Sequence, residues 1–159
     1  MMKPQFVALQ LTAALLLATA TASAATPALS PAQASFGDWR SAIGAIVRIE
    51  PCSAGNPDIC IRVVKLSPNP PVTIDVHNPD ASLRHREVCG LTVGSGFRQY
   101  DDHRLGYGHL YDPITGHTYR GYITPAGHDL LKLRGYVLFT LFGRTETWSR
   151  VPTQPTVCR

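Results

Sequence analysis

Beyond its N-terminal segment, the sequence lacks any long apolar run and any stretch with the 3.6-residue apolar period of an amphipathic helix. A helix that crosses a bilayer needs about 20 apolar residues, so the body of the chain is predicted not to span a membrane. Clustered basic charge is also missing, because 15 Lys and Arg stand against 11 Asp and Glu and the arginines are spread from Arg40 to Arg159. We therefore expect no nucleic-acid partner.

The motifs of common catalytic and cofactor-binding sites are absent as well. Residues 94–96 read Gly-Ser-Gly, but Val93 and Phe97 stand where a G-x-S-x-G nucleophile motif has its outer glycines. Residues 143–145 have neither the glycine-rich loop nor the lysine of a phosphate-binding loop. We therefore predict no cofactor and, on balance, no enzymatic activity.

None of the four cysteines has the C-x-x-C spacing of a zinc ribbon or a thioredoxin-like protein. An even count in an exported chain favours two disulfides, for which three connectivities are possible. We favour Cys52–Cys60, because these residues bracket the turn-rich stretch 53–58 between two apparent strands. Cys89–Cys158 then follows by elimination and would tie the C-terminal tail to the domain.

The N-terminus has the order of a cleavable secretory signal. Lys3 precedes an apolar stretch over residues 6–20, and small residues follow at 22–24. We predict cleavage after Ala24 and a periplasmic or secreted protein, with a retained N-terminal anchor as the alternative. The expected organisation is a signal peptide (1–24), a flexible lead-in (25–35), one β domain (36–152) and a C-terminal tail (153–159), in a monomer.

Apolar residues in the domain recur with period two, as in Ile43, Ala45, Val47 and Ile49. Further short β-rich runs, separated by Gly, Pro, Asn and Asp, cover residues 61–66, 72–76, 91–97, 107–112, 118–124, 130–136 and 144–151. The one helical candidate is short, near residues 79–84, with Asn78 as its N-cap.

The best-defined hairpin surrounds residues 112–116, whose Asp-Pro-Ile-Thr-Gly sequence favours a type I turn followed by a left-handed residue. Its register would place Asp112 opposite His117 and Leu110 opposite Tyr119. Glycines inside these strands mark bends or close backbone approach, which a closing sheet needs. We therefore predict an all-β fold, a single small antiparallel barrel or barrel-like sheet of about eight strands, with a small β-sandwich as the alternative.

Two features at the ends of the domain resemble lipocalin-like barrels. Gly37-Asp38-Trp39 opens the first strand, and the last strand alternates Arg144, Glu146, Trp148 and Arg150 on one face. In a closed barrel the first and last strands are neighbours, so an arginine of the last could lie across Trp39. The alternative is two separately packed tryptophans.

Several segments in order resemble a bacterial exported family known as domain of unknown function 2147, over residues 37–151. The segments are Gly37-Asp38-Trp39, Cys60, Asn78-Pro79-Asp80, Cys89-Gly90-Leu91, Tyr111-Asp112-Pro113, Gly116, Tyr119, Leu133-Arg134-Gly135-Tyr136 and residues 143–150, Gly-Arg-Thr-Glu-Thr-Trp-Ser-Arg. The chain departs from the family pattern at Ile61, where members often have Gly, and at His117, where they often have Lys. The resemblance implies an envelope location and one β-rich domain, and it assigns no activity.

Aromatic and Arg-bearing strands favour a binding module for a small apolar or amphipathic ligand with an acidic head, or for an envelope partner. The candidate binding residues are Trp39, Tyr119, Arg134, Arg144, Trp148 and Arg150. A barrel of about eight strands either fills with side chains or holds one small ligand. The alternative is a structural or stress-related envelope protein with a filled core, whose arginines pair with Glu146 and backbone carbonyls.

A second alternative is a hydrolase or metal-assisted enzyme that uses Asp112 and His117 across the hairpin. Six histidines are present, but a metal site needs three or four converging ligands and only this pair has a predicted geometry. The same pair could equally close the turn by a hydrogen bond. We predict no metal site.

Overall fold

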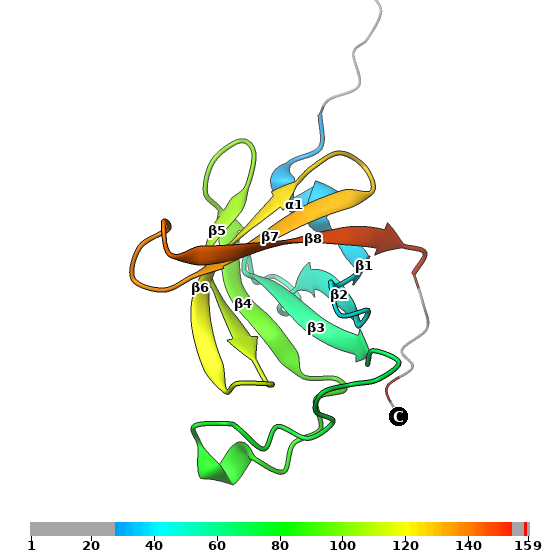
Figure 1. Ribbon diagram of the computed structural model, residues 1–159. Coiled ribbons are helices and arrows are strands. Elements are labelled where there is room, and N and C mark those ends of the chain that lie inside the picture. The colour runs from blue at the N-terminus through cyan, green and yellow to red at the C-terminus, as the bar shows by residue number, and fades with distance from the viewer. Residues whose placement is uncertain (1–27, 154–157, 159) are drawn as a thin grey trace, which may run out of the picture.

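The computed structural model describes residues 28–153 and 158, which form a closed eight-stranded antiparallel barrel with each strand next to its sequence neighbour (Figure 1). Strand β8 pairs with β1 to close the sheet. The elements are α1 (Pro31–Ser35), β1 (Gly37–Arg40), β2 (Ile46–Pro51), β3 (Ile59–Lys65), the 3₁₀ turn η1 (Ala81–Leu83), β4 (Thr92–Gln99), β5 (Leu105–Asp112), β6 (His117–Pro125), β7 (Leu130–Tyr136) and β8 (Gly143–Val151). The predicted all-β barrel is confirmed.

The strand count is right, but two strand assignments are wrong. The first predicted strand is two strands, β1 and β2, joined by a turn over residues 41–45. Residues 72–76 form no strand and contribute one bridge, between Ile74 and Glu87. Prolines at positions 68, 70 and 71 remove backbone donors just before this segment, and residues 66–91 form a long connection between β3 and β4.

The predicted helix near 79–84 is a single 3₁₀ turn, η1, whose N-cap is Asp80 rather than Asn78. The Asn78 amide is engaged elsewhere, because its Nδ2 donates to Asp75 at 2.8 Å. Its Oδ1 accepts from the Asp80 N–H at 2.9 Å, so the Asn78 side chain orders the turn just before η1 instead of capping the helix.

The flexible lead-in predicted over residues 25–35 is wrong for its last part, because Pro31–Ser35 form α1. Ser30 caps this helix by accepting from the Gln33 backbone N–H, and the Gln33 side chain accepts from the Ser30 backbone in return. The α1 helix contacts β4 and β6 and covers one end of the barrel, here named the closed end. The predicted signal peptide and most of the predicted tail lie outside the described residues.

Trp39 and Arg150 join α1 to the barrel. The Arg150 guanidinium lies 4.1 Å above the Trp39 ring, as the sequence predicted for an arginine of the last strand. Its Nη1 donates to Phe36 O at 2.8 Å and its Nη2 to Ala34 O at 2.7 Å. The Trp39 indole donates to Ser35 O at 2.8 Å. One cation thus satisfies carbonyl oxygens at the end of α1 that a short helix leaves without internal donors.

Gly37 is required where the chain enters β1. Its φ is +118°, and a Cβ here would lie 2.9 Å from Arg150 Nη1. Any side chain would therefore strain the backbone and displace the guanidinium. The glycine of the Gly37-Asp38-Trp39 motif is therefore needed so that the Arg150 guanidinium can lie over Trp39.

The barrel interior is densely packed toward the closed end. The largest fully buried apolar side chains there are Trp39, Ile49, Phe97, Leu105, Ile123 and Leu131. Inward glycines on neighbouring strands make room for large side chains: the ring of Phe97 lies over Gly108, and a Cβ at Gly121 would lie 2.6 Å from Leu110 Cδ1. These glycines permit close approach inside the barrel, as their position in the strands predicted.

Both disulfides have the pairing favoured from the sequence, Cys52–Cys60 and Cys89–Cys158. The first closes the connection between β2 and β3. The second joins residue 158 to Cys89, near the end of the long 66–91 connection that leads into β4.

Candidate ligand-binding cavity

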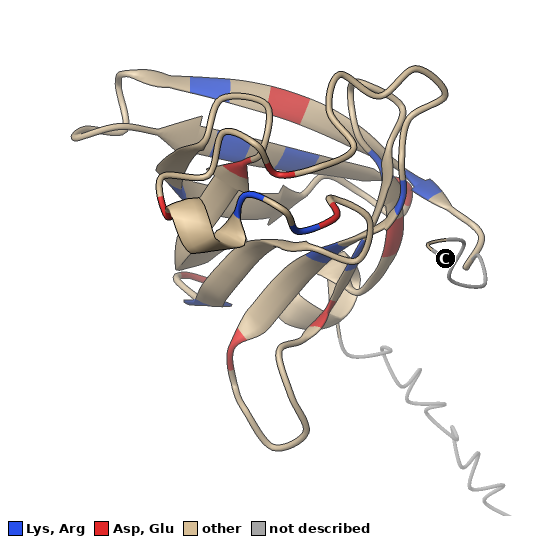
Figure 2. Ribbon diagram, turned by 90° about the horizontal axis from the view of Figure 1, so that it is seen from below, with Lys and Arg blue, Asp and Glu red and all other residues tan. Residues whose placement is uncertain are grey.

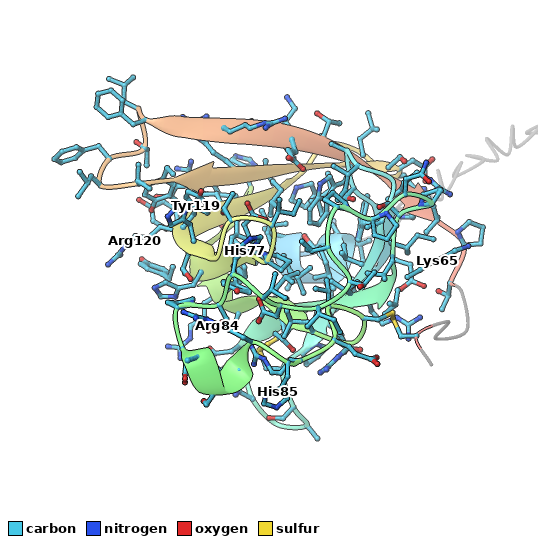
Figure 3. All side chains as sticks on the ribbon, turned by 60° about the horizontal axis from the view of Figure 1, so that its bottom comes forward. Lys65, His77, Arg84, His85, Tyr119 and Arg120 are labelled. Atoms are coloured by element: carbon cyan, nitrogen blue, oxygen red, sulfur yellow. A yellow bond between two sulfur atoms is a disulfide. The ribbon has the colours of Figure 1, made fainter. Side chains whose placement is uncertain are left out.

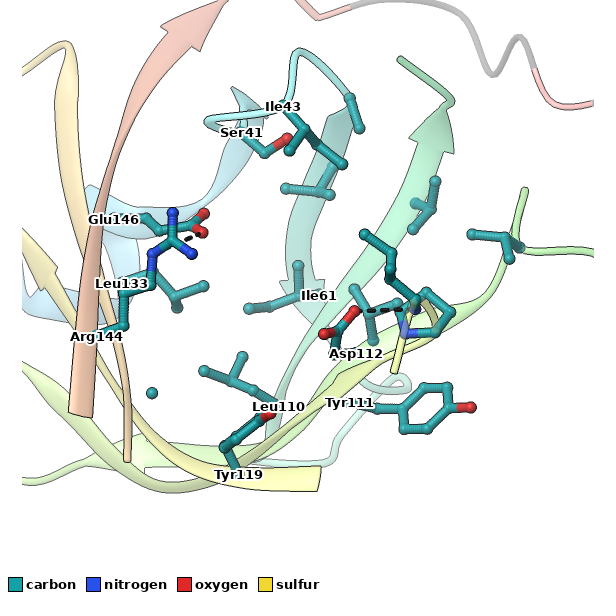
Figure 4. Close-up of a pocket in the computed structure, with 18 of the residues that line it drawn as sticks. Ser41, Ile43, Ile61, Leu110, Tyr111, Asp112, Tyr119, Leu133, Arg144 and Glu146 are labelled. Atoms are coloured by element: carbon teal, nitrogen blue, oxygen red, sulfur yellow. Dashed lines mark hydrogen bonds and ion pairs between the residues drawn. The ribbon is translucent and has the colours of Figure 1, made fainter. Parts of the chain in front are cut away.

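A cavity of about 490 Å³ occupies the end of the barrel opposite α1, here named the open end. This volume lies within the range of about 300–1,000 Å³ that is usual for small-molecule sites. The close-up in Figure 4 shows apolar side chains from several strands around it. Its buried apolar lining includes Val47, Ile61, Val63, Val88, Leu110, Leu133 and Trp148.

Four connections form the rim of the cavity. They are the β1–β2 turn (41–45), part of the long connection 66–91, the β5–β6 turn (113–116) and the β7–β8 connection (137–142). In Figure 1 the long connection, with η1, lies at the bottom and α1 lies near the top, so the cavity opens away from the helix. The interior is therefore filled at one end and hollow at the other.

A buried carboxylate holds the long connection against β5. The Asp75 side chain is fully buried and accepts hydrogen bonds from Tyr111 Oη, from Asn78 Nδ2 at 2.8 Å and from Arg86 Nη2 at 2.8 Å. Tyr111 lies on β5, while the other three residues belong to the connection. One wall of the cavity is thus fixed by an ion pair and two further hydrogen bonds.

The same network shifts two pKa values. Burial raises the pKa of the Asp75 carboxyl, but the hydrogen bonds from Tyr111, Arg86 and Asn78, with the charge of Arg86, outweigh it and leave that pKa below its ordinary value. Burial and the bond to Asp75 raise the pKa of Tyr111 to about 12. Asp75 is therefore a carboxylate at neutral pH and Tyr111 a neutral donor.

The charged groups of the cavity and one buried hydroxyl come from three sides: Arg144 and Glu146 on β8, Asp112 at the β5–β6 turn and Ser41 on the β1–β2 turn. Glu146 accepts a hydrogen bond from Trp148 Nε1 at 3.1 Å, and Arg144 Nε lies 4.0 Å from Glu146 with its side chain 85% exposed (Figure 4). On the β1–β2 turn, Ser41 Oγ is buried and has no hydrogen-bond partner among the described residues. An unpaired buried hydroxyl is costly, and a ligand's polar atom would satisfy it.

The six candidate binding residues fall into three groups. Tyr119, Arg144 and Trp148 line the cavity. Trp39 and Arg150 form the contact at the closed end. Arg134 does not line the cavity: its Nη1 donates to Thr145 Oγ1 at 2.9 Å, because it lies between two inward residues of β7 and its side chain points out.

The hairpin register is as predicted, with Asp112 opposite His117 and Leu110 opposite Tyr119. The Asp112 carboxylate is occupied by its own turn, because Oδ1 accepts from the Ile114 N–H at 2.9 Å and Oδ2 from Thr115 Oγ1 at 2.8 Å. His117 is exposed. Within residues 28–153 and 158, no group of three or more His, Cys, Asp or Glu side chains is placed to hold a metal ion.

Sequence analysis missed Ser41, Leu133 and the whole contribution of residues 66–91 to the site. The inward position of Leu133 could have been found from its alternation with Lys132 and Arg134. Nothing local marks Asp75, because its partner Tyr111 lies 36 positions away in the chain.

An antiparallel eight-stranded barrel, closed at one end by a short helix and hollow at the other, is a lipocalin-like fold. Consistent with this, the structure resembles a protein from the human pathogen Helicobacter pylori, HP1028, which is described as belonging to the lipocalin family. The TM-score is 0.65 at 18% sequence identity, over 74% of this chain and 83% of that one. The chain belongs to the family described as "Uncharacterized protein conserved in bacteria (DUF2147)", whose family model matches residues 37–150.

A comparison with curated proteins found no match. Among the residues that the structure describes, no helix is long and apolar enough to cross a membrane.

Proposed function

We propose that this protein is an exported, non-enzymatic binding module that holds one small apolar or amphipathic ligand in the open end of its barrel. The observation that carries this proposal is the cavity of about 490 Å³, which is lined mainly by buried apolar side chains. Burial of apolar ligand surface would contribute about 25 cal/mol per Å². The lipocalin-like fold of the HP1028 neighbour supports the same class of function.

The polar groups favour a ligand with one hydrogen-bonding or acidic head. Among the described residues that line the cavity, Arg144 is the one cation, and its 4.0 Å separation from Glu146 leaves most of its donors available. Ser41 offers a second contact on the opposite rim. A fatty acid has this combination of an apolar chain and a single carboxylate.

The proposed compartment is the periplasm or the medium outside the cell. Two disulfides are typical of proteins that fold in an oxidising compartment. Export is also supported by the N-terminal sequence, in which Lys3 is followed by an apolar stretch and then by Ala22-Ser23-Ala24.

Filling the cavity should weaken ligand binding without unfolding the barrel. Gly135 lines the cavity, and a Cβ there would lie 3.7 Å from both Leu110 Cδ1 and Tyr119 Cβ, which is ordinary contact. We expect Gly135→Phe to weaken binding of a fluorescent fatty acid by at least about tenfold, because the ring takes the ligand's space. Fluorescence titration measures the affinity and thermal melting checks the fold.

The control for this variant is Thr147→Phe, which puts the same ring on the outer face of the adjacent strand β8. It should leave the affinity unchanged. If Gly135→Phe melts like the wild type and still binds the probe normally, the cavity is not the binding site and the proposal is wrong.

Removing the charge of Arg144 at the mouth of the cavity should lower the affinity for acidic ligands and leave the affinity for neutral ligands unchanged. We expect Arg144→Gln to weaken binding of the fluorescent fatty acid by about fivefold, the scale of an exposed ion pair, and to leave binding of its methyl ester unchanged. Equal losses for acid and ester would show that Arg144 acts on the shape of the mouth and not on the ligand's charge.

A further inference from the structure

The connection between β7 and β8, Val137–Phe142, is an exposed apolar loop beside the mouth of the cavity. Its sequence is Val-Leu-Phe-Thr-Leu-Phe, and in Figure 1 it extends from the body of the barrel as the orange connection at the left. The exposed fractions of four of its side chains are among the highest for large apolar residues in the described chain: Leu138 89%, Leu141 81%, Phe139 69% and Phe142 65%. Contiguous exposed apolar side chains usually mark an interaction surface.

The backbone of the apolar loop is a tight turn that would normally use other residue types. Leu138 has a φ of +57°, a left-handed conformation that Gly or Asn adopts at lower cost. Hydrogen bonds from Val137 N to Phe142 O at 3.2 Å and from Phe142 N to Phe139 O at 3.0 Å close the turn. An apolar side chain therefore stands at an exposed position where both backbone strain and contact with water disfavour it.

Basic side chains surround the base of the apolar loop. Arg134 donates to Thr140 O and so holds the middle of the loop. Arg120 lies beside residues 137–140 in a shallow groove, and Figure 3 shows it on the same side of the barrel as the loop. Arg144 lies two residues after the loop, and Figure 2 shows basic segments on the strands that lead into it. Glu146 is the acidic side chain paired with one of these arginines.

A projecting apolar tip with three arginines near its base matches a lipid surface with anionic headgroups. The tip would enter the boundary between headgroups and acyl chains, while the guanidinium groups would lie at the level of the phosphates. A flat protein partner would contact a broad face, whereas here the most exposed apolar side chains, Leu138, Phe139 and Leu141, lie on one narrow connection. We propose that the apolar loop docks the protein on a bilayer that contains anionic phospholipid, with the mouth of the cavity next to the membrane.

This inference concerns the outer surface and holds whatever the cavity binds. Val137 and Phe142 also line the mouth, so docking would bring the cavity opening to the place where an apolar ligand leaves or enters a bilayer. The two proposals fail separately, because vesicle binding and probe binding are measured independently.

The test is cosedimentation of the purified protein with vesicles of phosphatidylcholine, with and without phosphatidylglycerol. We expect binding to the vesicles that contain phosphatidylglycerol, and a loss of about 100-fold for Phe139→Ser combined with Leu141→Ser, because each apolar side chain contributes about tenfold or more when buried. Arg120→Gln should weaken binding to the anionic vesicles by about fivefold. The variant residues are exposed, so melting temperatures should stay close to that of the wild type.

A matched control is Leu29→Ser combined with Leu130→Ser, which removes two exposed apolar side chains from the closed end and should leave vesicle binding unchanged. A Phe139→Trp variant gives a direct signal, because both native tryptophans are buried. Its emission should shift to the blue on anionic vesicles. No vesicle binding, binding that the loop variant retains, or a loop-dependent dimer that forms without lipid would each overturn the proposal.

Discussion

Replacing Trp39 by alanine should lower the free energy of unfolding by about 3–5 kcal/mol, the scale for deleting a buried tryptophan. Its ring is fully buried, and the Arg150 guanidinium lies 4.1 Å above it. The substitution also removes the hydrogen bond from the indole to Ser35 O. The result would be a cavity at the point where α1, β1 and β8 meet, and chemical denaturation monitored by circular dichroism measures the change.

Two further variants separate the contributions at the closed end. Trp39→Phe keeps an aromatic ring below Arg150 and should cost less than the alanine variant. Leu130→Ala, at an exposed position at the same end, should stay within about 0.5 kcal/mol of the wild type. A change of that small size for Trp39→Ala would mean that the contact between the first and last strands does not stabilise the barrel.

Replacing Asp75 by alanine should lower the free energy of unfolding by about 3 kcal/mol, because three hydrogen bonds to a buried carboxylate are lost. Arg86 is partly exposed, so water can solvate the cation that remains and limits the loss. The long connection 66–91 should also open locally, and hydrogen exchange of the Asp75 and Val88 amides, which donate to Arg86 O and Thr73 O, measures this.

The contribution of Asp75 should depend on pH in a defined direction. Its pKa is lower in the folded protein than in the unfolded chain, where it is about 3.9. The stabilisation is therefore fully present above the unfolded pKa and is lost as the pH falls through the folded pKa. The difference in stability between the wild type and Asp75→Asn should shrink when the pH is lowered below about 4.

Other acidic groups also have lowered pKa values, among them Asp58 beside Arg98 and Asp101 beside His103 and Arg104. Acid unfolding of the wild type alone would therefore not isolate Asp75, which is why the comparison with Asp75→Asn is needed. A difference that stays constant down to pH values well below the unfolded pKa would show that folding does not lower the pKa of Asp75.

Much of the barrel followed from local patterns. The Asp-Pro-Ile-Thr-Gly sequence at 112–116 predicted the β5–β6 register correctly, because turn geometry determines strand pairing over a short distance. The first strand was harder, because the period-two pattern runs through the turn at 41–45 and conceals the boundary between β1 and β2. The helix α1 was missed because its signals, the Ser30–Gln33 capping box and Pro31, stand in a short Ala-rich stretch with no apolar period.

The candidate site was predicted less well than the fold. Trp148, Arg144 and Tyr119 line the cavity as proposed from the sequence, but Arg134 points outward and instead holds the apolar loop. A shift of one residue along a strand moves a side chain to the other face. A site can therefore be assigned only when it is known which residues of each strand point into the barrel.

By itself, the sequence predicted an all-β barrel and the Cys52–Cys60 disulfide, because alternation, turn residues and close cysteine spacing act over short distances. The arginine across Trp39 and the Cys89–Cys158 disulfide join distant segments, and the structure decided between them and their alternatives. Only the tertiary structure decided that the barrel is hollow at one end. That outcome depends on the summed volumes of side chains converging from eight strands, and on a loop held in place by a carboxylate whose tyrosine partner is distant in the chain. No local sequence pattern predicts the remaining interior volume or the position of that loop.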